Sequence, residues 1–198
     1  MIYQIKIIAK NINSMNRTIL IDSESSFEDL HIYTNHIFWL KNIHLYDFKY
    51  KEEFFINMPQ KENNFALGIS LLWDKTLSEY INDSEVEDLI SIKNHFANKT
   101  KLSDIFDKID NISYMYDFGS NWDFDMKIQK TIYDQNTTKP KLMTANGGNL
   151  IEDCGWYSWY NDLLEMIDKK KYDEDLFESK EDFEEYIKPI LQKVVLDI

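Results

Sequence analysis

The sequence predicts an α+β fold: a single domain in which a mostly antiparallel sheet packs around a central helix, followed by a helical C-terminal segment. Short segments with alternating apolar residues recur through the first 130 residues, and such alternation is typical of half-buried strands. One clear helical stripe lies among them, over residues 26–38. Five Gly and three Pro leave little material for flexible linkers, so we expect one compact domain.

The N-terminal region predicts a β-hairpin followed by a helix. Residues 2–9 alternate, and residues 17–22 are rich in β-branched side chains, so both segments are expected to be strands. Ser25 and Glu28 have the spacing of a capping box, and the apolar residues after them recur at helical intervals. These signals predict the helix over residues 26–38.

The next pattern predicts a strand with one strongly aromatic face. Residues 43–50 alternate, and His44 falls on the same face as Tyr46, Phe48 and Tyr50. Further along the chain, the same criteria predict a strand at residues 65–72, a helix that begins after Ser84 and reaches Phe96, and a short helix at residues 100–106.

The clearest local feature is a second hairpin over residues 112–128. The turn sequence Gly119-Ser120-Asn121 separates two alternating arms, whose apolar faces include Phe118 and Trp122. On the opposite face, the alternation is expected to bring several carboxylates close together, namely Asp117, Asp123 and Asp125.

The C-terminal part of the chain predicts two helices. The first covers residues 158–168, and the second begins after Ser179, which has a capping partner in Asp182. Pro189 is expected to kink or split the second helix. We expect residues 1–168 to form the α+β domain and residues 169–198 to form an acidic helical extension packed on it.

Charge and composition bear on compartment and partners. The net charge is −13, and Arg17 is the only arginine, which weighs against nucleic-acid binding because guanidinium groups supply most phosphate and guanine contacts. No apolar window is long enough to span a membrane, and the single Cys154 cannot form an intramolecular disulfide. We therefore expect a cytoplasmic protein without a membrane partner, for which a protein partner is conceivable. The oligomeric state has no signature in the sequence.

Two groups of polar residues are candidates for chemistry. Asp117, Asp123, Glu152 and Asp153, with Asp125 nearby, could converge into an oxygen-rich site for a divalent cation such as Mg²⁺. The alternative, which we favour on sequence alone, is that the hairpin acids accept backbone bonds at the turn. Glu152 and Asp153 would then cap the helix that begins near residue 156.

His31 and His44 form the second group. Together they could act as general acid and base or as half of a metal site. The structural alternative, again favoured on sequence alone, is that each ring helps to hold the helix on the sheet by hydrogen bonds. Trp39 and Trp122 are candidates for an aromatic lining. No G-x-G-x-x-G, Walker A or G-x-S-x-G pattern occurs, so no motif indicates a cofactor.

Four blocks of sequence resemble one family in the same order. They are YQIKI near the N-terminus, FEDLHIYTNHIFWLKNIHLYDF at 27–48, LSDIFDKIDNISYMYDFGSNWDFDMKI at 102–128, and NGGNLIEDCGWYSWYNDLL at 146–164. The chain resembles the pRiA-plasmid ORF-three-like family, some members of which carry the label of a resolvase-like passenger protein of an insertion element. The resemblance implies an α+β domain without a settled activity.

The resemblance also implies which positions recur. They are His31, Trp39, His44, Asp117, Gly119, Trp122, Asp123, Glu152 and Asp153. The chain departs from the family at several motif positions: Ser120 and Asn121 replace an acidic pair, Phe124 replaces a histidine, and Asn149-Leu150-Ile151 replaces Cys-Pro-Pro. Where the resemblance implies a tryptophan-arginine pair, the chain has Asn16-Arg17.

Because these motifs are eroded, we expect a non-catalytic accessory or interaction domain of mobile-element origin. The alternatives are a divalent-metal-dependent hydrolase or nuclease that uses the hairpin and loop carboxylates and, from the family labels alone, a resolvase-like DNA-associated factor.

Overall fold

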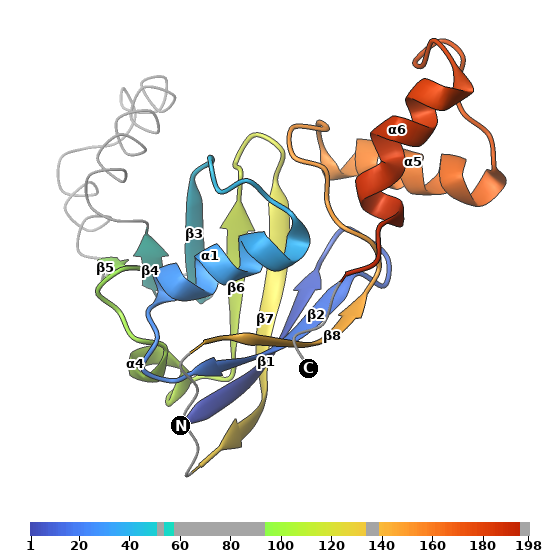
Figure 1. Cartoon of the computed structure of the whole chain (residues 1–198). Coiled ribbons are helices and arrows are strands. Elements are labelled where there is room, and N and C mark those ends of the chain that lie inside the picture. Colours follow the sequence, from blue (N-terminus) through green and yellow to red (C-terminus); the bar gives the residue numbers. More distant parts are fainter. Residues whose placement is uncertain (51–53, 58–93, 134–138, 195–198) are drawn as a thin grey trace, which may run out of the picture.

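The computed structural model describes residues 1–50, 54–57, 94–133 and 139–194, and these residues form one sheet and four helices (Figure 1). The strands are β1 (Ile2–Ala9), β2 (Asn16–Asp22), β3 (Tyr46–Tyr50), β4 (Phe54–Asn57), β5 (Asn94–Phe96), β6 (Asn111–Tyr116), β7 (Trp122–Ile132) and β8 (Lys141–Asn146). The helices are α1 (Phe27–Phe38), α4 (Leu102–Phe106), α5 (Tyr157–Lys169) and α6 (Lys180–Leu191).

The sheet has the order β5-β4-β3-β6-β7-β1-β2-β8 within the described residues. Every neighbouring pair is antiparallel except β4 and β5, which are parallel. The predicted α+β class with a mostly antiparallel sheet is therefore confirmed. Both predicted hairpins, β1–β2 and β6–β7, form as adjacent strands.

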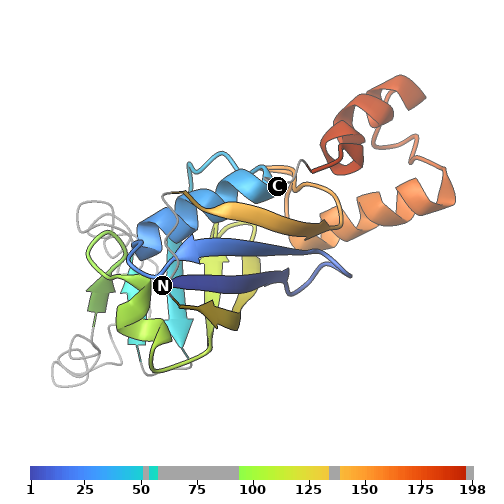
Figure 2. The same cartoon turned by 60° about the horizontal axis from the view of Figure 1, so that its bottom comes forward.

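The sheet curls around α1, as Figures 1 and 2 show from two directions. The long strand β7 pairs with β6 along its first half and with β1 along most of its length. A β-bulge places Gln129 between the residues that face Gln4 and Ile5, and a bulge increases local twist and bends the strand. Strand β7 lies between the strands β5-β4-β3-β6 on one side and β1-β2-β8 on the other. Its bend therefore turns these two parts of the sheet toward each other.

Helix α1 fills the space that the sheet encloses. Its N-cap is Ser26, whose hydroxyl accepts a bond from the Asp29 N–H, while the Asp29 carboxylate accepts from the Ser26 N–H. The predicted box of Ser25 and Glu28 was thus wrong by one residue. The residues of α1 that face the sheet are buried, and the core around them includes Phe27, Leu30, Phe38, Phe48, Tyr114 and Phe124.

The C-terminal helices lie beyond the end of the sheet, to the side of α1 (Figures 1 and 2). Ser179 caps α6 as predicted, and the helix continues through Pro189 before it ends at Leu191. The end of α6 approaches the main body so closely that a Cβ at Gly148 would lie 2.0 Å from the Ile190 carbonyl oxygen. Only glycine fits at that position.

Some predictions fall outside the described residues. These are the strand at 65–72 and most of the helix after Ser84. The last residues of that predicted helix, Asn94–Phe96, form strand β5 instead. The strand predicted at 43–50 begins only at Tyr46, so His44 lies in the loop before it.

Candidate functional site

Three loops at one end of the sheet bring four polar side chains together. Strand β3 begins at Tyr46, directly opposite Tyr116, the last residue of β6. The residues just before β3 and just after β6 are therefore neighbours, and the Asp117 N–H donates to the Leu45 carbonyl at 2.9 Å. This register places His44 beside Asp117. The loop between β8 and α5 adds Glu152 and Asp153.

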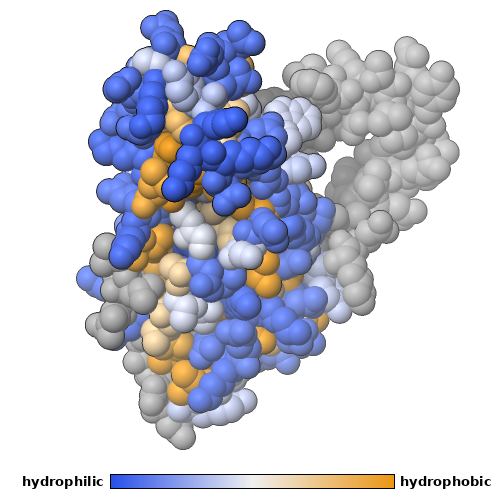
Figure 3. Space-filling view, turned by 90° about the vertical axis from the view of Figure 1, so that its right-hand side faces the viewer, coloured by the Kyte–Doolittle hydropathy of each residue, from blue (hydrophilic) through white to orange (hydrophobic). Residues whose placement is uncertain are grey.

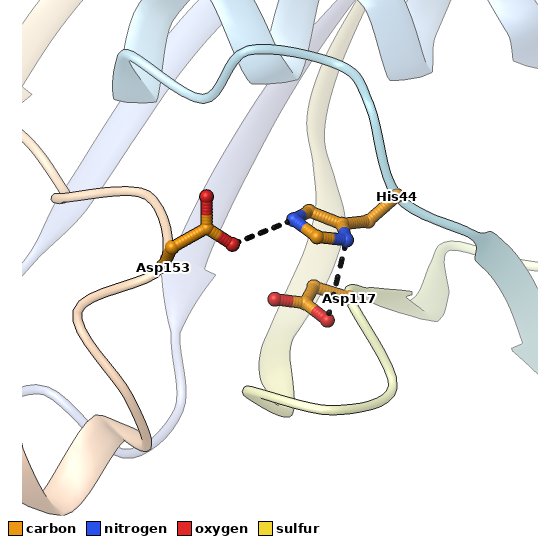
Figure 4. Close-up of side chains that lie close together, drawn as sticks. All are labelled: His44, Asp117 and Asp153. Atoms are coloured by element: carbon orange, nitrogen blue, oxygen red, sulfur yellow. Dashed lines mark hydrogen bonds and ion pairs between the residues drawn. The ribbon is translucent and has the colours of Figure 1, made fainter.

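The imidazole ring of His44 lies between two carboxylates, as Figure 4 shows. Nδ1 is 3.7 Å from an Asp117 oxygen, and Nε2 is 3.0 Å from an Asp153 oxygen. Nε2 is also 3.3 Å from Glu152 Oε1. One potential ligand atom from each of His44, Asp117 and Asp153 lies within 4.8 Å of the others. We call these three residues and Glu152 the His44 cluster.

Glu152 is the most firmly held member of the cluster. Its side chain is 2% exposed, Oε2 accepts from the Lys41 N–H, and Oε1 accepts from the Tyr116 hydroxyl at 2.8 Å. The Tyr116 oxygen in turn accepts from the Ile43 N–H at 3.0 Å. Burial raises the pKa of Tyr116, and its bond to Glu152 raises it further, so the hydroxyl keeps its proton and remains a donor.

Asp117 and Asp153 both adopt left-handed backbone conformations, with φ of 55° and 56°. Aspartate tolerates this region better than most residues, and residues held there often mark functional sites. The conformation turns Asp117 away from the polar face of its hairpin, where alternation predicted it. Asp117 is buried and accepts from the Gly119 N–H at 3.1 Å, whereas Asp153 is 55% exposed.

The structural roles expected for these acids hold only in part. Asp117 does accept a backbone bond at the turn, as expected. Glu152 and Asp153 do not cap α5, because its N-cap is Trp156, whose side chain makes no capping bond. Their carboxylates face His44, Tyr116 and the α1–β3 loop instead. The expected capping role was therefore wrong.

The remaining candidate residues lie apart from the His44 cluster. Asp123 and Asp125 form ion pairs with Lys10, each at 3.2 Å, on the other face of the hairpin. Trp122 is buried in the core, edge-on to Tyr160, while Trp39 caps the C-terminal end of α1 and is exposed. His31 is buried in a separate hydrogen-bond network described below.

The plasmid pRiA4b ORF-3-like protein family has a sequence model that matches residues 1–190. The chain belongs to this family. The resemblance expected from the four sequence blocks is thereby confirmed. No functionally curated protein matches the sequence.

The fold is similar to that of a solved structure. It is a protein from Methanosarcina mazei Go1, MM3350, whose crystal structure is described as that of a protein of unknown function. The TM-score is 0.65 at 19% sequence identity, and the match covers 98% of this chain and 95% of the other. At this identity the likeness shows the fold alone.

One position at which the resemblance implies a different residue lies outside the His44 cluster. Phe124, which stands where the resemblance implies a histidine, is fully buried between Phe38 and Tyr114. A polar group at that position would face the core beneath α1.

His31 links α1 to the sheet and to the loop that carries His44. Nδ1 is 2.7 Å from the Tyr114 hydroxyl, Nε2 bonds to Asn42 Oδ1, and the ring stacks on Tyr46 at 3.5 Å between centroids. The Tyr114 hydroxyl also donates to Asn35 Oδ1 at 3.1 Å, and the Asn35 amide donates to Asn42 Oδ1 at 3.2 Å. This confirms that His31 joins helix and sheet, although its partners are side chains.

Sequence reasoning missed the residues that support the cluster. Neither Tyr116 nor Asn42 is among the candidate residues that the sequence indicates. Asn42 has φ of 58°, and it fixes the loop from which Lys41 and Ile43 direct their N–H groups at Glu152 and Tyr116. The available signal was a short polar break between a helix and an aromatic strand.

We predict opposite contributions of His31 and Asp47 to the pH dependence of stability. Burial lowers the pKa of His31 to about 4. As the pH falls from 6.5 toward 4, His31 is therefore protonated in the unfolded chain but remains neutral in the folded chain. The free energy of unfolding then falls by up to about 3 kcal/mol. Burial raises the pKa of Asp47 to about 6, so this carboxyl gains a proton first in the folded state and adds stability over the same interval.

Urea unfolding of three proteins at about pH 7 and about pH 4.5 tests this pair. His31→Gln should lose less stability on acidification than the wild type does, and Asp47→Asn should lose more. An equal pH dependence in all three proteins would show that neither group titrates differently in the folded and unfolded states.

Within the parts of the chain that the structure describes, no helix is both long and apolar enough to cross a membrane.

Proposed function

We propose that this domain binds a divalent transition-metal ion at the His44 cluster. The observation that carries the proposal is the mutual approach of His44, Asp117 and Asp153, which come from three separate loops and offer ligand atoms within 4.8 Å of one another. Glu152 adds a third carboxylate, held in place by hydrogen bonds to Tyr116 and to the Lys41 backbone. Ligands that are fixed by surrounding hydrogen bonds are typical of metal sites.

The ligand types favour Mn²⁺ or Zn²⁺ over Ca²⁺. Imidazole nitrogen is a ligand that transition metals prefer, whereas Ca²⁺ is held almost entirely by oxygen. Three carboxylates beside one imidazole also carry enough negative charge to compensate a divalent cation. Mn²⁺ accepts both carboxylate and imidazole ligands, and it is therefore the first probe.

Hydrolysis is a second candidate function, and the exposure of the cluster favours it. His44 is 29% exposed and Asp153 is 55% exposed, so a cation bound there would keep coordination positions that face water. Catalytic metal sites differ from structural ones in having such an open position. The net charge of −13 favours small substrates over nucleic acid for this chemistry.

The exposed apolar side chains near the cluster support a role in protein interaction. Trp39, Ile43, Phe118 and Trp156 are all exposed, and each lies within three residues in sequence of a residue that belongs to the cluster or bonds to it. Large apolar side chains gathered around one region are typical of contact surfaces. Affinity capture with the wild type and with Phe118→Ser tests this role. A partner retained by the wild type and lost by the variant would support it, and equal retention by both would contradict it.

Isothermal titration with Mn²⁺ and Zn²⁺ tests the proposed metal site. We expect one site per chain, with binding that weakens as pH falls, because protons compete for the carboxylates and the imidazole. A chain that binds neither ion at millimolar concentration would contradict the proposal. Ca²⁺ serves as the comparison ion and is expected to bind more weakly.

A further inference from the structure

The loop between α1 and β3 is bonded on two sides. On one side, the Lys41 N–H donates to the Glu152 carboxylate. The Ile43 N–H donates at 3.0 Å to the Tyr116 hydroxyl, which itself donates to Glu152. On the other side, Asn42 directs its side-chain oxygen at α1. The side chain of Asn42 and the backbone before and after it therefore bind different parts of the molecule.

The side-chain oxygen of Asn42 is anchored in a buried polar network. It bonds to Nε2 of His31 and accepts from Nδ2 of Asn35 at 3.2 Å. His31 and Asn35 lie one turn apart on α1, and they are 2% and 1% exposed. The Tyr114 hydroxyl joins both of them to β6, at 2.7 Å from His31 Nδ1 and 3.1 Å from Asn35 Oδ1. The loop is therefore held from the core as well as by its own residues.

Two requirements meet at position 42. The backbone has a φ of 58°, a left-handed conformation that glycine and asparagine adopt more readily than other residues. Glycine would meet this requirement, but it has no oxygen to which His31 and Asn35 could bond. Because a buried polar group that loses its partner costs stability, the amide has a role that the backbone conformation does not explain.

Helices α5 and α6 take no part in the network. They occupy the side of the molecule that Figure 3 shows, where a strip of hydrophobic residues runs between hydrophilic ones. Within the described parts of the chain, the side-chain hydrogen bonds of Asn42, His31, Asn35 and Tyr114 connect only α1, β6 and the α1–β3 loop. The network thus reaches the His44 cluster through residues 41–43.

We propose that Asn42 is a positioning residue for the His44 cluster and acts through Glu152. By holding the loop, its amide keeps the two flanking N–H groups in place, and these fix the Glu152 carboxylate directly and through Tyr116. A carboxylate that is already oriented binds a cation more tightly than one that must be ordered on binding. This inference rests on the proposed metal site.

The affinity of Asn42→Gly for Mn²⁺, measured by isothermal titration, tests the proposal. Glycine keeps the left-handed backbone and removes the amide, so binding should weaken by about tenfold. Ser14→Gly is the matched control, because Ser14 is an exposed, uncharged residue with a φ of 63° in the loop between β1 and β2. It should leave the affinity unchanged. Equal effects of the two substitutions, or an unchanged affinity in Asn42→Gly, would overturn the proposal.

A double-mutant cycle separates action through Glu152 from a general loosening of the fold. Glu152→Ala removes the carboxylate that Asn42 orients in this account. The double variant, Asn42→Gly with Glu152→Ala, should then bind Mn²⁺ no more weakly than Glu152→Ala alone. Effects on the affinity that multiply in the double variant would show that Asn42 acts by another route, which would overturn the proposal.

Amide hydrogen exchange without metal measures the same positioning independently. The N–H groups of Lys41 and Ile43 are bonded in the wild type, and both should exchange at least about tenfold faster in Asn42→Gly. The amides of β1 and β7 should exchange as in the wild type. If the wild type binds no Mn²⁺, the metal site itself is wrong. Faster exchange would in that case still support the positioning of Glu152 by Asn42, and unchanged exchange would overturn it.

Discussion

Replacing His44 by alanine is expected to reduce the affinity for Mn²⁺ by at least about 100-fold, because it removes the only nitrogen ligand and leaves the carboxylates to repel one another. His44 lies in a loop and its side chain is partly exposed, so the variant should fold normally. Isothermal titration measures the affinity, and urea unfolding without metal checks the fold.

Two further variants make the His44 result specific. Glu152→Gln keeps the shape of the side chain but removes a negative charge, and it should weaken binding by about tenfold. Asp125→Asn removes the same charge from an exposed carboxylate that pairs with Lys10 outside the cluster, and it should leave binding unchanged. If Asp125→Asn weakens binding as much as His44→Ala does, the cation binds through general negative charge instead of the His44 cluster.

Replacing Arg17 by alanine is expected to lower the free energy of unfolding by about 3 to 5 kcal/mol. Arg17 is fully buried, and its guanidinium group donates to the backbone carbonyls of Ile37, Asn16, Asn146 and Gly148 while it lies 4.7 Å from the centre of the Phe38 ring. The substitution leaves a cavity and removes the donors from carbonyls at the end of α1 and after β8. Both losses destabilise the fold.

A lysine at position 17 is not expected to restore the stability that Arg17 provides. An ammonium group is a point charge on a flexible stem and cannot reach carbonyls arranged around a planar fork, so Arg17→Lys should also destabilise the protein by more than about 2 kcal/mol. Lys141→Ala, at an exposed position of β8, serves as the control and should change stability by less than about 0.5 kcal/mol. Urea unfolding measures all three variants. A lysine variant as stable as the wild type would contradict the role assigned to the four carbonyl bonds.

Arg17 also connects stability to the candidate site. Its bonds fasten the segment after β8 to the end of α1, and this segment continues through Leu150, whose N–H donates to Phe38, to Glu152 and Asp153. Variants of Arg17 should therefore weaken metal binding as well as stability. Variants of His44 should affect metal binding alone.

The sequence predicted the strands and helices well where a local pattern determines them. Alternation in β1, β2, β6 and β7 and the helical stripe of α1 follow from side-chain periodicity, which depends on neighbours in sequence. Errors arose where a competing signal lay one residue away. Ser25 and Ser26 both have an acidic residue three positions later, and the structure uses Ser26 with Asp29.

The site was predicted less well, because its geometry depends on contacts between distant segments. The six candidate residues included all four members of the His44 cluster, but nothing in the sequence separated them from His31 and Asp123. That separation depends on the register of β3 with β6 and on the left-handed conformations of Asp117 and Asp153. Strict alternation placed Asp117 with Asp123 and Asp125, and alternation does not hold where a strand ends in a turn.

The most direct test of the metal site is a crystal structure grown with Mn²⁺, with anomalous diffraction recorded to locate the ion. We expect one anomalous peak within about 2.5 Å of a nitrogen of His44 and of carboxylate oxygens of Asp117 and Asp153, with Glu152 as a ligand or one water removed. A structure in which the ion binds elsewhere, while His44 keeps its contacts to Asp117 and Asp153, would contradict the proposal.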